Sequence, residues 1–215
     1  MTRTLLALLM LVQCCSAPQH TGAGGGGASV TTGNALIVGC VASAASAPTI
    51  TVSDTAGNTF NPMGSQLAWN SNGSFTEMFV ALNVTGNSSD AITCNYSASV
   101  SYPGLVAVQY SGVATSSAVD VTNASGQCTN CNGVTSSSFT TAQAQEVIVA
   151  IYNANNSVTF TAGTGFTIEV QAGGTGSSGF ALADEVTSAV QSAVSTSTSW
   201  SGASVPGAIL VGSLK

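Results

Sequence analysis

The chain is nearly without basic residues. Only Arg3 and Lys215 carry a basic side chain, against eight carboxylates, and the formal net charge is −6. Proteins that bind nucleic acid neutralise its phosphates with clustered lysine and arginine side chains. No such cluster can form from two basic residues at opposite ends of the chain, so the sequence excludes nucleic acid as a partner.

Histidine is almost as scarce. The single histidine, His20, lies in a glycine-rich stretch near the N-terminus and outside the β-prone part of the chain. A serine–histidine–aspartate triad and a histidine-containing zinc site both require an imidazole within the folded part. The sequence therefore excludes both for the folded domain.

Charge of either sign is rare. Charged residues make up 5% of the chain and hydrophobic residues 44%, whereas about 25% of an average soluble domain is charged. Glycine, serine, threonine and asparagine must therefore supply the polar surface, which we expect to be neutral. The apolar content is sufficient for one substantial core, and the length fits a single domain.

A sustained helical period is also lacking, and short β-prone runs separated by turn residues take its place. Residues 35–41 form a continuous apolar run and residues 74–84 are mostly apolar on both faces, which is typical of strands covered on both sides. Residues 105–113, which are apolar on one face, and residues 146–152 are predicted to be buried core strands. Such runs predict an antiparallel two-sheet sandwich of jelly-roll type with about a dozen strands. We expect residues 105–113 to form a central strand of one sheet.

The N-terminus has the pattern of a secretory signal peptide, predicted over residues 1–17. Two processing routes are open: ordinary cleavage, or lipidation of Cys14 in the sequence L-V-Q-C, which would anchor the protein to a membrane. Residues 18–28 are predicted to be a flexible glycine-rich linker and residues 29–215 the β-sandwich domain. Either route predicts an extracellular or cell-surface protein.

Four cysteines remain after ordinary cleavage: Cys40, Cys94, Cys128 and Cys131. The last two have the C-x-x-C spacing of zinc and redox sites, but neither a second ligand pair nor a βαβ pattern accompanies them. A local disulfide is the better interpretation. The even number predicts a second bridge between Cys40 and Cys94, if their strands lie close together.

The carboxylates lack the pattern of a glycosidase. Glycoside hydrolysis requires two carboxyl groups about 5 to 9.5 Å apart across a cleft. The alternating acids E-x-D-x-E of jelly-roll glucanases are absent, and the adjacent Asp184 and Glu185 should point to opposite faces of their strand. We therefore predict that the protein is not an enzyme and keep a carbohydrate-active hydrolase as a weaker alternative.

Calcium is the one cofactor that the polar residues of the sequence could bind. The turn D-T-A-G-N places Asp54 and Asn58 close together, Asp90 lies in another predicted turn, and Asp120 lies in a predicted short strand, residues 118–122. Calcium takes carboxylate, amide and backbone oxygens as ligands. The sequence thus names Asp54 and Asn58 as candidate calcium ligands and predicts no other cofactor.

Three aromatic residues lie beside predicted loops: Trp69, Tyr102 and Trp200. Exposed aromatic rings serve as platforms for sugar rings. These residues are therefore candidate ligand contacts, and packing in the core is the alternative role of each.

Several short motifs resemble those of poorly characterised bacterial and phage-associated extracellular β-sandwich modules, similar to concanavalin A-like lectin and glucanase jelly rolls. The motifs are T-V-S-D-T-A-G-N-T-F (51–60), V-A-V-Q-Y-S-G-V (106–113), Q-E-V-I-V-A (145–150), G-T-G-F-T (163–167) and A-D-E-V (183–186). The resemblance implies a sandwich fold and extracellular attachment, and it implies no active site.

The sequence thus predicts a non-catalytic extracellular binding or adhesion module for a glycan or another cell-surface ligand. A structural subunit or decoration of an extracellular or phage assembly is the alternative. Strand edges with few charges are poorly protected against pairing with another chain, so self-assembly is compatible with the composition.

Overall fold

The computed structural model describes residues 23–24, 27–71, 73–172 and 178–215. The predicted signal peptide, Cys14 and His20 lie outside the described residues. Within the range predicted as a linker, Ala23–Gly24 forms strand β1 and Ala28 begins strand β2.

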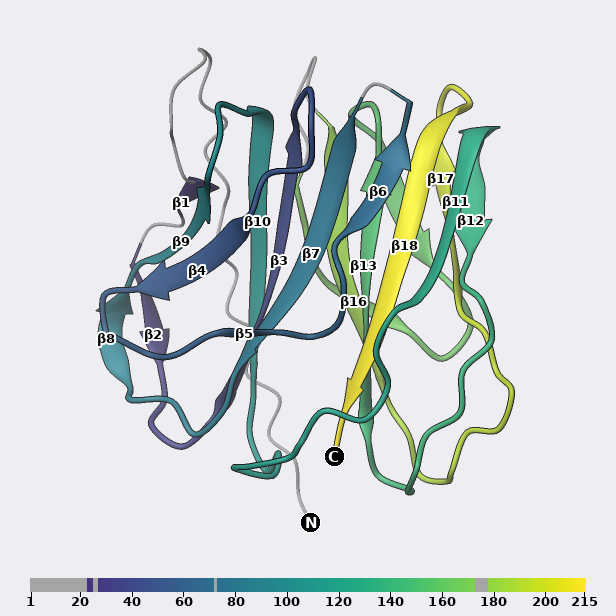
Figure 1. The fold of residues 1–215 in the computed structure, drawn as a ribbon. Helices are drawn as coiled ribbons and strands as arrows, with labels where there is room; N and C mark the ends of the chain where they lie inside the picture. Colours follow the sequence, from purple (N-terminus) through teal and green to yellow (C-terminus); the bar gives the residue numbers. More distant parts are fainter. Residues whose placement is uncertain (1–22, 25–26, 72, 173–177) are drawn as a thin grey trace.

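All regular elements of the described residues are strands, and every pairing between them is antiparallel (Figure 1). The prediction of an antiparallel β-sandwich is confirmed. The strand orders do not by themselves establish a jelly-roll connectivity.

Two inner sheets form the middle of the molecule. The first inner sheet contains β10 (Ser101–Tyr110), β3 (Ala35–Ser43), β7 (Ser74–Ala81) and β5 (Asn61–Pro62) in that order, and β6 (Leu67–Asn70) also pairs with β7. The second inner sheet contains β11 (Ala124–Cys131), β18 (Val205–Leu214), β13 (Val147–Ala154), β16 (Gly179–Val186) and β15 (Thr167–Ala172).

Smaller sheets cover the outer faces, so that four layers are stacked where the sequence predicted two. The first outer sheet contains β1, β9 (Ile92–Tyr96) and β4 (Ile50–Asp54), and the second contains β12 (Gly133–Thr135), β17 (Ser197–Ser201) and β14 (Thr159–Ala162). Strands β2 (Ala28–Val30) and β8 (Asn87–Asp90) form a separate pair. Figure 1 shows the first outer sheet beside the first inner sheet.

The stacking produces three hydrophobic cores. Alternate residues of an inner strand point to opposite faces, so in β3 Ile37 packs in the central core between the inner sheets, whereas Leu36 and Val38 face the first outer sheet. In β13, Val149 likewise faces the central core and Ile148 the second outer sheet. This arrangement explains why these sequence runs are apolar on both faces.

Strand β10 is buried, as its sequence predicted, and both of its faces are covered, but it does not hold a central place in its sheet. It stands at the end of the strand order and pairs, among the described strands, with β3. Its residues are apolar because other layers pack on both of its faces. Its burial does not depend on having a partner strand on each side within the sheet. Strands β3 and β7 have partners on both sides.

The two halves of the chain have the same strand arrangement. The order β10–β3–β7 in the first inner sheet corresponds to β18–β13–β16 in the second, and the outer pair β9–β4 corresponds to β17–β14. Strands β10 and β18 both have ten residues, and they begin at residues 101 and 205, a shift of 104. The same shift relates β7 to β16 and β9 to β17, whereas the shift is 112 from β3 to β13 and 110 from β4 to β14. The fold is therefore an internal repeat.

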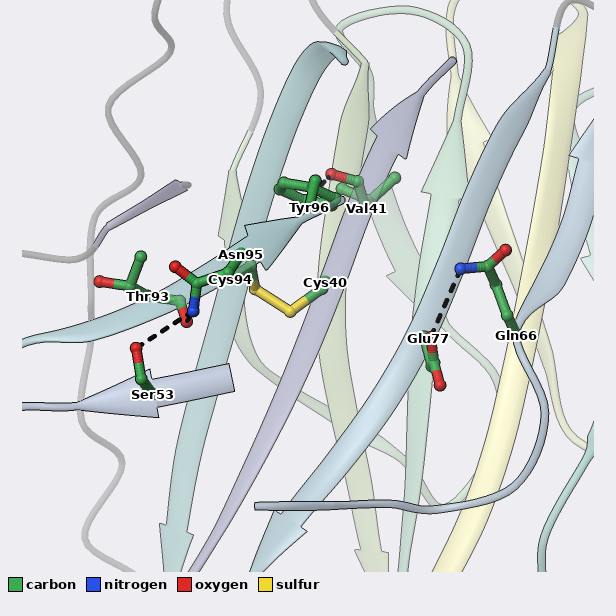
Figure 2. Close-up of a disulfide and its surroundings, with 9 residues drawn as sticks. All are labelled: Cys40, Val41, Ser53, Gln66, Glu77, Thr93, Cys94, Asn95 and Tyr96. Carbon is green, nitrogen blue, oxygen red and sulfur yellow. Dashed lines mark hydrogen bonds between the residues drawn. A yellow bond between two sulfur atoms is a disulfide. The ribbon is translucent and has the colours of Figure 1, made fainter. Parts of the chain in front are cut away.

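The inner and outer sheets are joined by a disulfide in the first half of the chain and by packed aromatic rings in the second. In the first half the disulfide between Cys40 on β3 and Cys94 on β9 crosses the core, as Figure 2 shows. The position equivalent to Cys40 is Tyr152, because their partners on β10 and β18 are related by the shift of 104. Tyr152 packs against Phe160, and Phe160 packs edge-on against Trp200, with 6.0 Å between ring centroids in each pair.

Candidate functional site

A neutral groove of about 460 Å³ lies between β6 of the first inner sheet and β11 of the second. Its polar lining consists of Asn70 and Ser71 on one wall and Gln127 and Thr129 on the other, and no charged side chain of the described residues lines it. Gln127, Thr129 and Ser71 are exposed. Amide and hydroxyl groups both donate and accept hydrogen bonds, so the groove suits an uncharged ligand rich in hydroxyl groups.

Bulges in both walls shape this groove. The pairing of β6 with β7 shifts between Ala68 and Asn70, and that of β11 with β18 shifts between Cys128 and Cys131. A bulge bends a strand and redirects its side chains. The predicted disulfide between Cys128 and Cys131 is present and spans the second bulge, which holds the wall in place next to Gln127 and Thr129.

A second groove, of about 390 Å³, lies between β5 and residues 115–119. Its polar lining consists of Thr59, Asn61, Thr115 and Ser117, and its apolar lining includes Pro62 and Leu82. It has one side-chain amide where the first groove has two, and more of its lining is apolar.

The structure does not bring the three predicted ligand aromatics together. Trp69 lines the first groove, but it is only 3% exposed, and its indole N–H donates to Thr76 Oγ1 at 3.0 Å. Trp200 is 4% exposed and belongs to the core under the second outer sheet. Tyr102 is 51% exposed and has a positive φ of 52°. Of the three, only Tyr102 presents much of its ring to solvent.

The predicted calcium ligands Asp54 and Asn58 are hydrogen-bonded to each other. Asn58 donates its backbone N–H to Asp54 Oδ1 at 2.8 Å and its side-chain amide to Asp54 Oδ2 at 2.6 Å. The described residues contain no group of three or more histidine, cysteine, aspartate or glutamate side chains that could hold a metal ion. In this structure the Asp54 carboxylate stabilises its own turn.

The two other carboxylates considered for calcium also have protein partners. Asp90 is buried and accepts hydrogen bonds from the Thr55 N–H and hydroxyl groups and from the Ala56 N–H. Burial raises its pKa above the ordinary value. Asp120 accepts from the Ala142 N–H at 2.6 Å and lies 4.0 Å from the Lys215 ammonium group.

The structure also reveals a buried carboxylate that the sequence pattern did not single out as a site. Asp184 on β16 is 4% exposed and lies opposite Val149, so its side chain points to the central core. Burial raises the pKa of Asp184 to about 6, while the neighbouring Tyr110 hydroxyl lowers it and the charge of Glu169 raises it further. At the equivalent position of the first repeat, opposite Ile37, the chain has Val80.

This comparison predicts that replacing Asp184 by valine stabilises the protein at pH 8 by roughly 3 kcal/mol, the free-energy equivalent of raising the pKa from 3.8 to about 6. The folded protein binds the Asp184 proton more tightly than the unfolded chain. The contribution of the Asp184 carboxyl to the free energy of unfolding is therefore favourable below about pH 4 and is lost as the pH rises through about 6. Denaturant unfolding at pH 4 and pH 8 should show a smaller fall in stability for Asp184→Val than for the wild type. Equal falls in both proteins would contradict the prediction.

The described chain is thus a disulfide-bonded, four-layered antiparallel β-sandwich built from two repeats, with a neutral groove between the inner sheets. No known protein family, curated protein or solved structure matches this chain. The described residues form no helix that is long and apolar enough to cross a membrane. Two disulfides are typical of proteins that fold in an oxidising environment.

Proposed function

We propose that this protein is a non-catalytic extracellular module that binds a neutral glycan in the groove between β6 and β11. The observation that carries the proposal is the lining: amide and hydroxyl side chains face each other across the groove without a charged group. A sugar offers vicinal hydroxyl groups, each of which donates and accepts, and side-chain amides match this pattern. The two disulfides support an extracellular location.

The rigidity of the walls adds to this support. The Cys128–Cys131 disulfide constrains the wall that contains Gln127, and the buried Trp69 holds β6 against β7 through its hydrogen bond to Thr76. A binding site that is ordered before the ligand arrives avoids the entropic cost of ordering side chains during binding. The resemblance of the sequence motifs to concanavalin A-like extracellular modules agrees with glycan binding.

A glycan array of neutral and acidic oligosaccharides, followed by calorimetry on the strongest ligand, tests the proposal. We expect neutral glycans to bind, and the double variant Gln127→Ala/Thr129→Ala to bind roughly 30-fold more weakly, because two lost hydrogen bonds cost about 1 kcal/mol each. The matched control is Thr115→Ala/Ser117→Ala in the second groove, which should leave the affinity unchanged. An array without neutral glycans, or equal affinity of the two double variants, would contradict the proposal.

A role as a structural subunit has less support. Strands β11 and β15 stand at the two ends of the second inner sheet, and both contain a register shift. Bulges are among the devices that prevent one sheet edge from pairing with another chain. Light scattering at increasing concentration distinguishes the two functions, because a glycan-binding module should keep a constant mass and an assembly subunit should not.

A further inference from the structure

We propose that Asp184, Glu169 and Tyr110 form a binding site for a hard divalent cation such as Ca²⁺. The three residues come from three strands of the two inner sheets: Asp184 from β16 and Glu169 from β15 in the second, and Tyr110 from the last position of β10 in the first. The site is separate from the groove between β6 and β11, and the inference does not depend on glycan binding.

The pairing of the strands accounts for this convergence. Thr167 on β15 is opposite Asp184, and the register shifts between Ile168 and Val170, so that Glu169 is the bulged residue. Strand β10 of the first inner sheet packs against both β15 and β16. The side chain of Tyr110 thereby meets Asp184, and both Tyr110 and Asp184 interact electrostatically with Glu169.

Two of the oxygen atoms in this cluster lack a well-formed hydrogen bond. Tyr110 is 3% exposed and Asp184 4%; the Tyr110 hydroxyl interacts with the Asp184 carboxylate and lowers its pKa, yet neither that hydroxyl nor Asp184 Oδ2 completes a hydrogen bond of normal geometry. Leaving a buried polar group unsatisfied is costly. A bound cation would use both oxygen atoms and offset this cost.

The internal repeat shows that the fold does not require polar residues here. The shift of 104 residues places Leu214 at the position of Tyr110 and Val80 at the position of Asp184. Both counterparts are buried apolar residues of the central core. The pair equivalent to Tyr110 and Asp184 is therefore apolar. The requirements of core packing do not explain why Tyr110 and Asp184 are polar.

The charge of the cluster favours a cation as the ligand. The only basic side chain of the described residues, Lys215, lies 4.0 Å from Asp120, so no basic residue is left to neutralise Asp184 and Glu169. Calcium prefers carboxylate and neutral oxygen ligands and fills the remaining positions with water. Because the cluster has two carboxylates and not three or more, we expect a dissociation constant of about 10⁻⁴ to 10⁻³ M, the range of extracellular calcium modules.

Terbium luminescence and thermal unfolding test this inference. Tb³⁺ replaces Ca²⁺ at oxygen sites and emits when a nearby tyrosine transfers energy to it, so the wild type should show emission that added Ca²⁺ competes away. At pH 7.5, 10 mM CaCl₂ should raise the unfolding midpoint by roughly 3 to 10 °C relative to NaCl of the same ionic strength. The double variant Asp184→Asn/Glu169→Gln should lose both responses.

Folding of the variants is not an obstacle, because Asp184→Asn removes a buried charge and keeps the size of the side chain. The variant Asp54→Asn is the control for the other acidic turn and should keep both responses. Tyr110→Phe should keep the thermal response in part and lose most of the terbium emission. The inference is overturned if the wild type shows no response, if the double variant retains it, or if Asp54→Asn abolishes it.

Discussion

The free energy of unfolding should fall by roughly 4 kcal/mol when Cys40 and Cys94 are both replaced by alanine, according to the chain-entropy estimate for a long loop. The two cysteines are 54 residues apart in the sequence, and both are fully buried in the core between the first inner and first outer sheets. Without the bridge the unfolded chain gains much conformational freedom. The outer sheet also loses its covalent link to β3.

The variant Cys128→Ala/Cys131→Ala is the matched comparison. Its cysteines are three residues apart, so the same estimate gives a loss of roughly 2 kcal/mol. Urea unfolding of both double variants and of the wild type, under non-reducing conditions, measures the difference. Equal losses would show that the length of the closed loop does not decide the contribution of each bridge.

The second large effect is expected for Trp200→Ala, which should lower the free energy of unfolding by about 3 to 5 kcal/mol, the usual range for a buried aromatic residue. Trp200 packs edge-on against Phe160, and its indole lies against Gly207, where any side chain would collide with the ring. These contacts hold the second outer sheet on the second inner sheet. In the first half of the chain, the Cys40–Cys94 disulfide has this role.

Tyr102→Ala is the control for this experiment, because Tyr102 is the most exposed of the three aromatic candidates. Its removal should change stability by less than about 0.5 kcal/mol, as is usual for surface positions. Chemical denaturation of both variants tests the contrast. If Trp200→Ala proved as stable as Tyr102→Ala, the packing role of Trp200 would be refuted.

The strands could be predicted from the sequence because their apolar positions follow the two-residue period of extended chain. Residues 35–41 and 146–152 are examples, and they lie in or overlap β3 and β13. The cysteine count and spacing likewise predicted both disulfides, which the structure contains. The continuous apolar runs showed that both faces are covered, but they did not show by how many layers.

The candidate sites were harder to predict. Gln127 and Thr129 flank a cysteine on β11 without any motif of their own, and they become a groove wall only when β6 comes to lie beside β11. Asp184 could not be told from a surface carboxylate, because its burial depends on the sheet packed above it. The repeat was equally hidden, because equivalent positions such as Tyr110 and Leu214 share a buried location and not a residue type.

The sequence by itself determined the class of structure: an antiparallel β-sandwich, nearly free of charge, with an even number of cysteines available for disulfides. These properties depend on local periodicity, composition and cysteine number, all of which are present in the unfolded chain. Only the tertiary structure decided the four layers, the pairing of the two repeats, the neutral groove and the burial of Asp184 beside Tyr110. Each of these depends on contacts between strands far apart in the sequence, and no local pattern of residues encodes such distances.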